Sequence, residues 1–116
     1  ATQVFGGNVT IGMTYTTAKF RKENPKLYVA FLAALNEAVD LIKKDPRKAA
    51  EIYIEVTKEK TSADELVAMM SQPGFEFGTT PQNVVKMGQF MNRIGSISAS
   101  PKDWKELFFD NIHCLV

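Results

Sequence analysis

The sequence is poor in the residues that most often carry chemistry, with one cysteine, one histidine and one tryptophan among 116 residues. A single cysteine excludes an internal disulfide. One cysteine and one histidine are also too few for a zinc site, which takes about four ligands. His113 and Cys114 are neighbours in the chain, and adjacent side chains rarely place a base within hydrogen-bond reach of a nucleophile. The sequence therefore predicts a protein that is not an enzyme, without a metal site or a cofactor.

The chain also lacks a large net charge and long apolar runs. A formal net charge of +1 provides no basic field to attract nucleic acid, so no nucleic-acid partner is expected. No apolar run approaches the roughly 20 residues needed to span a bilayer. Residues 1–7 have neither the basic start nor the apolar stretch of a signal peptide, although a trimmed, exported chain would have lost one. The length suits one domain.

Helix starts are well marked. An oxygen-bearing side chain precedes a proline in four places: Asn24-Pro25, Asp45-Pro46, Thr80-Pro81 and Ser100-Pro101. Such side chains accept hydrogen bonds from the first helical turn, and proline suits the first helical position. The pattern predicts helices from about residues 25 to 44, 46 to 58, 81 to 94 and 101 to 110. A capping box, Ser62 to Glu65, predicts a further helix before Pro73.

One segment has the period of a strand. Val9, Ile11, Met13 and Tyr15 alternate with threonines and glycine, which predicts a strand over residues 9–15 with one apolar face. Residues 75–77 read as a second, short extended segment. We divide the chain into a turn (residues 1–8), a strand (9–16), a helical scaffold (17–110) and a tail (111–116). A lone strand has two unpaired edges, so the sequence predicts a homo-oligomer that pairs residues 9–15.

Gly6, Gly7 and Asn8 form the most plausible ligand-facing turn, together with Thr10. Glycines let backbone N–H groups approach a ligand closely. The pattern matches neither a dinucleotide-binding fingerprint nor a phosphate loop. A turn that simply leads into the strand is an equally good interpretation of these residues.

Several stretches, in order along the chain, resemble the C-terminal part of ABC-importer substrate-binding proteins of the nitrate/sulfonate/taurine type, whose superfamily includes the thiamine-pyrimidine synthases. The stretches are residues 6–10 (GGNVT), 16–27 (TTAKFRKENPKL), 33–38 (AALNEA), 49–53 (AAEIY), 77–84 (FGTTPQNV), 90–95 (FMNRIG) and 104–109 (WKELFF).

The resemblance implies an α/β fold, namely the C-terminal portion of a two-lobed type 2 periplasmic-binding-protein fold whose N-terminal lobe portions are absent here. It implies a function in delivering a small ligand to an ABC permease, in the periplasm or another extracytoplasmic compartment. Gly6, Gly7, Asn8 and Thr10 would face the ligand cleft. Two alternatives stay open: a fragment of an enzyme similar to the thiamine-pyrimidine synthases, or a free-standing helical interaction module.

Overall fold

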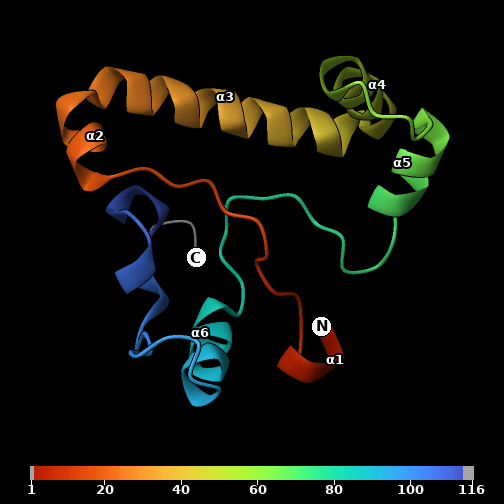
Figure 1. The fold of residues 1–116 in the computed structure, drawn as a ribbon. Helices are drawn as coiled ribbons and strands as arrows, with labels where there is room; N and C mark the ends of the chain where they lie inside the picture. Colours follow the sequence, from red (N-terminus) through yellow and green to blue (C-terminus); the bar gives the residue numbers. More distant parts are fainter. Residues whose placement is uncertain (1, 114–116) are drawn as a thin grey trace. The chain divides into compact units, whose positions relative to one another are not determined.

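The structure, a computed structural model, describes residues 2–113 (Figure 1). All regular structure among these residues is helical, and none of them forms a strand. They divide into two compact units. Residues 15–78 make a continuous unit, and residues 2–14 and 79–113 together make a discontinuous unit.

The continuous unit contains α2 (Ala18–Glu23), α3 (Pro25–Lys44), α4 (Pro46–Thr57) and α5 (Ala63–Met70). The discontinuous unit contains α1 (Thr2–Phe5), α6 (Val84–Arg93) and two 3-10 turns, η1 (Trp104–Leu107) and η2 (Asp110–Ile112).

Side-chain caps set two helix starts in the continuous unit as the sequence predicts. The carboxylate of Asp45 accepts a hydrogen bond from the Lys48 N–H at 2.9 Å and begins α4. Ser62 and Glu65 form the predicted capping box, in which each side chain accepts from the other residue's N–H. Both predictions are confirmed, because these oxygens satisfy N–H groups that have no partner within the helix.

Asn24 begins α3 by position but not by its side chain. It is the N-cap residue, and Pro25 follows it at the first helical position. Its side-chain amide instead donates to the Phe20 carbonyl at 3.1 Å, which belongs to α2. The same asparagine therefore closes one helix and opens the next.

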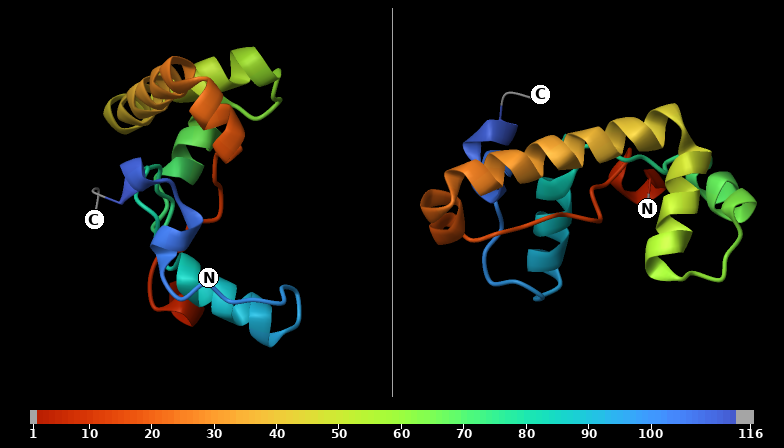
Figure 2. Two further views of the ribbon diagram at one scale, coloured as in Figure 1. Left: turned by 90° about the vertical axis from the view of Figure 1, so that its left-hand side faces the viewer. Right: turned by 90° about the horizontal axis from the view of Figure 1, so that it is seen from above.

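Helix α4 packs against both α3 and α5. Figure 2 shows α4 turning sharply away from the axis of α3. Ala50 of α4 is buried, with 2% of its surface exposed. Arg47 of α4 pairs with Asp64 of α5, and this hydrogen bond raises the pKa of the guanidinium. The rest of the continuous unit buries little apolar surface. Even the apolar stripe of α3 is only half-buried.

The discontinuous unit is held by contacts around α6. Val84 and Gly88 of α6 are buried, and the ring of Pro101 lies directly against Gly88. His113 closes the end of this unit. Its Nε2 lies 2.9 Å from the Phe108 carbonyl and 3.1 Å from that of Lys105, so it donates a proton toward them.

The predicted α/β fold class is wrong, because the structure describes no strand and no sheet. Residues 9–15 form no strand. Thr10 pairs with one distant residue, while Ile11 and Tyr15 are 82% and 92% exposed. Period-two alternation indicates a strand only where a neighbouring ladder takes up the backbone groups, and none of the described residues supplies one. Residues 75–77 likewise run without strand pairing.

Two predicted helix starts are also wrong. α6 begins at Val84 rather than at Pro81, with Asn83 as its N-cap residue. No helix begins at Pro101. The η1 turn starts later, capped by the carboxylate of Asp103, and the hydroxyl oxygen of Ser100 is buried without a hydrogen bond among the described residues.

Candidate functional site

The predicted site residues lie together with the start of α6, in a cluster that we call the glycine corner. Its members are Gly6, Gly7, Asn8 and Thr10 on one segment, and Gln82, Asn83 and Lys86 on the other. All of them belong to the discontinuous unit. More than 70 residues of chain separate the two sides, so the cluster is a tertiary feature.

Polar contacts join the two sides at three points. The Thr10 N–H donates to the Gln82 carbonyl at 3.0 Å, and the Gln82 N–H donates to the Thr10 hydroxyl at 2.8 Å. The Asn83 amide donates to the Asn8 carbonyl at 2.7 Å. These bonds are part-buried, so breaking one would leave a poorly solvated polar group behind.

The third point is the Lys86 ammonium, which donates to the Phe5 carbonyl at 2.9 Å. Gly6 follows with φ of +72°, a left-handed conformation that a side chain disfavours. A Cβ on Gly6 would lie 3.7 Å from the Lys86 nitrogen, and one on Gly7 would lie 3.4 Å from the Asn83 amide nitrogen. Both are ordinary van der Waals distances, so it is the backbone conformation, and not a lack of space, that favours glycine at position 6.

The start of α6 gives the corner a positive character. Asn83 holds the N-cap position in a left-handed conformation, with φ of 52°, and its side chain does not cap the helix. No acidic residue occurs in the first turn, which contains Lys86. Helix N-termini carry a partial positive charge and bind anions through their N–H groups. The glycine corner is therefore chemically suited to a small anion.

Catalytic and metal-binding groups are not gathered here. No cluster of His, Cys, Asp and Glu side chains that could hold a metal occurs within residues 2–113. The only histidine, His113, lies in the η2 region with its ring edge-on to Trp104, at 5.6 Å between ring centres. Its predicted non-catalytic neighbour Cys114 lies outside the described residues. No helix of the described chain is long and apolar enough to cross a membrane.

One side of the corner, residues 6–10, could be predicted from the sequence, whereas the role of residues 82–86 could not. Gln82 and Asn83 stand in a stretch that carries the family resemblance, but nothing local marks them as partners of Thr10 and Asn8. The one usable signal is Asn83 itself, since asparagine tolerates the left-handed conformation better than most residues do. Nothing in the sequence around Lys86 indicates its contact with the Phe5 carbonyl.

Comparisons with known proteins give no independent guide to the site. The chain matches no protein-family model, no curated protein and no solved structure.

Proposed function

We propose that this chain takes part in solute binding for an ABC importer, and that the glycine corner contributes ligand contacts for a small anion or small organic molecule. Two points support this proposal, an inferred resemblance and a set of contacts. Residues 6–10 and 77–84 are among the stretches in which we infer a resemblance to nitrate/sulfonate/taurine-type binding proteins. These are also the segments that Asn83, Gln82 and Thr10 join by hydrogen bonds.

The chemistry of the corner favours an anionic group on the ligand. The first turn of α6 has no side-chain cap and no acidic residue. Lys86 adds a full positive charge within the same turn, and the glycines keep bulk away from the surface. A nitrate or sulfonate oxygen could accept from N–H groups there at little cost, because those groups are already oriented.

The proposal includes the permease as partner and an extracytoplasmic location, and it includes no catalytic step. The Nε2 of His113 faces the backbone carbonyls of Lys105 and Phe108. The resemblance that supports the proposal also implies an α/β fold, which the helical structure overturns.

Binding can be tested by NMR titration of the isotope-labelled chain with nitrate, taurine, an aliphatic sulfonate and a pyrimidine. A surface open on one side buries little of a ligand, so we expect weak, millimolar binding. Saturable amide shifts should be confined to residues 6–10 and 82–86 for at least one anion. The Lys86→Gln variant should weaken binding several-fold.

Lys102→Gln is the matched control, because it removes the same charge from an exposed position in the same unit. It should leave the titration unchanged. If both variants weaken anion binding equally, the effect arises from the net charge of the chain and not from a site. Amide shifts spread over the whole chain would also refute a site at the corner.

A helical interaction module is the second candidate, and exposed apolar surface favours it. In the part of the chain that the structure describes, Ala50 and Val84 are the buried apolar side chains, while Leu27, Val29 and Phe31 of α3 are 58%, 64% and 49% exposed. A helix that is apolar on several faces usually has a partner. Titration with no anion effect, combined with tight capture of a protein partner by α3, would favour this second function.

A further inference from the structure

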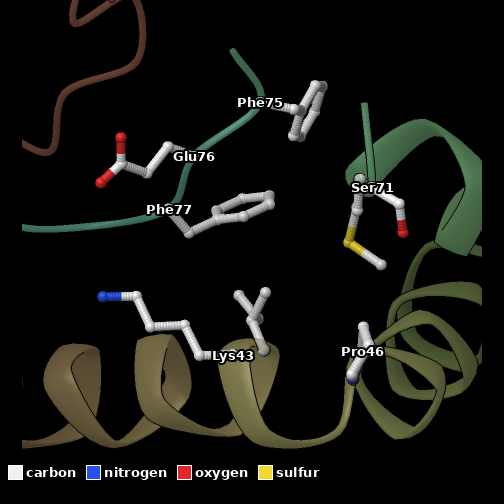
Figure 3. Close-up of a pocket in the computed structure, with 8 residues that line it drawn as sticks. Lys43, Pro46, Ser71, Phe75, Glu76 and Phe77 are labelled. Carbon is white, nitrogen blue, oxygen red and sulfur yellow. The ribbon is translucent and has the colours of Figure 1, made fainter. Parts of the chain in front are cut away.

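A cavity lies within the continuous unit. Its apolar walls are Ile42 from α3, Pro46 at the start of α4, Met70 at the end of α5, and the two rings of Phe75 and Phe77 (Figure 3). The volume is about 250 Å³. The cavity is open to solvent on one side. A closed cavity of roughly 150 Å³ holds benzene, so this volume admits one aromatic ring with a small substituent, which would stay partly exposed.

The two phenylalanines shape one wall of the cavity. Their ring centres lie 5.5 Å apart with planes inclined by 55°, an arrangement typical of aromatic pairs. Phe75 and Phe77 are 50% and 38% exposed, so both retain apolar surface that a ligand could cover. Figure 3 shows Glu76 on the opposite side of this segment from the two rings. The backbone thus presents the two rings to the cavity and places Glu76 at its rim.

The polar residues of the lining leave no strong preference for a charge. The Ser71 hydroxyl already donates to the Val67 carbonyl at 2.8 Å. Lys43 and Glu76 carry opposite charges, and in Figure 3 both charged ends lie on the side of Phe77 that faces away from Pro46. Their fields therefore oppose each other at this rim. A charged ligand would lose hydration without gaining an unopposed counter-charge.

We propose that this cavity binds a small, uncharged molecule with a single aromatic ring. The ring would contact Phe75, Phe77 and Ile42, and its substituent would point toward the rim. This inference is independent of the proposed function, because the glycine corner belongs to the other unit and favours anions.

Three matched probes test the proposal: benzyl alcohol, benzoate and benzylamine, which share a ring and differ in charge. Side-chain NMR spectra of the whole chain should show saturable shifts at Ile42, Met70, Phe75 and Phe77 with benzyl alcohol. Both charged probes should bind at least about tenfold more weakly, because each must be stripped of water. The absence of saturable shifts at these residues, or equal affinity for the three probes, would overturn the proposal.

Variants at the rim test the charge argument separately. Lys43→Met removes the positive charge of the lining and should improve benzylamine binding relative to benzoate, whereas Glu76→Gln removes a negative charge and should do the reverse. Phe77→Ala removes a wall and should abolish benzyl alcohol binding while the helical circular dichroism stays the same. Phe31→Ala, an exposed ring on α3 outside the cavity, is the control and should bind all probes as the unchanged chain does. Loss of binding in this control, or rim variants without effect, would refute a site at this cavity.

Discussion

Gly88 is the position where one added methyl group should reveal how the discontinuous unit is packed. A Cβ built there would lie 2.7 Å from both Cγ and Cδ of Pro101. Carbon atoms attract best at about 3.5–4.0 Å and repel steeply inside that distance. The proline ring is stiff, so relief requires the backbone of α6 or of residue 101 to move.

Two effects of Gly88→Ala oppose each other. Alanine stabilises a helix interior by roughly 0.8–1.0 kcal/mol relative to glycine. Forcing a methyl group into a filled space costs about 1–3 kcal/mol. The clash is severe and its partner rigid, so the packing penalty wins. We expect a net loss of about 1 kcal/mol in the free energy of unfolding.

The fluorescence of Trp104 measures this unit specifically, because the chain has one tryptophan and it lies in the same unit as Gly88 and Pro101. Urea unfolding should therefore show a lower midpoint for Gly88→Ala. In a Pro101→Ala background both clashing atoms are gone, and Gly88→Ala should become stabilising by just under about 1 kcal/mol. Gly12→Ala, where a Cβ meets nothing within 4 Å, is the control.

The reversal of sign is the decisive result. If Gly88→Ala stabilises the chain in the presence of Pro101, the contact between α6 and Pro101 does not exist in solution. If it destabilises equally in both backgrounds, the penalty arises from something other than the proline ring. A loss in Gly12→Ala beyond about 0.5 kcal/mol would mean that the assay reports general glycine effects.

Asp45→Ala should cost about 1 kcal/mol in thermal or urea unfolding followed by circular dichroism, since it removes the cap of α4. Ser100→Ala should be neutral or stabilising in the same assay, because its hydroxyl is buried without a partner among the described residues. The backbone N–H and then the hydroxyl of Ser62 hold the pKa of Glu65 below its ordinary value. That stabilisation is complete above the ordinary pKa and is lost as the pH falls through the folded one, so α-carbon shifts in α5 should report fraying at acid pH that Glu65→Gln no longer shows. His113→Phe retains a ring beside the tryptophan but loses the bonds to two carbonyls, and should lower the fluorescence-detected stability by about 1 kcal/mol.

Helix starts could be predicted where local chemistry decides them. Asp45 and Ser62 satisfy N–H groups one turn away, so a few neighbouring residues contain the whole interaction. Ser100-Pro101 has the same local appearance, but no helix begins there, and its proline ring packs against Gly88 of α6. Nothing in the neighbouring residues indicates that contact.

The strand prediction failed for a related reason. Alternation at Val9, Ile11 and Met13 specifies which side chains share a face, but not whether a second strand exists beside them. Thr10 instead meets Gln82, at a single point rather than along a ladder. The predicted oligomer through residues 9–15 stays a prediction, now without the strand that motivated it.

The glycine corner shows the same division between local and distant information. Gly6 and Gly7 could be singled out because glycine is the residue for left-handed backbone, and Gly6 adopts it. The residues that complete the corner follow the continuous unit in the sequence, and no periodicity links them to the glycines. Its positive character depends on where α6 begins, which the proline signal misplaced by three residues.

The interleaving of the two units imposes an order in time during synthesis. Thr10 leaves the ribosome before its partner Gln82, which follows 72 residues later. At roughly 5–20 residues per second, the segment around Thr10 waits about 4 to 14 seconds before it can dock. Residues 15–78 can form their helices within that interval. Throughout it Asn8 and Thr10 are without the side chain and backbone groups of Asn83 and Gln82 that they bond in the folded chain, so this unit is completed last.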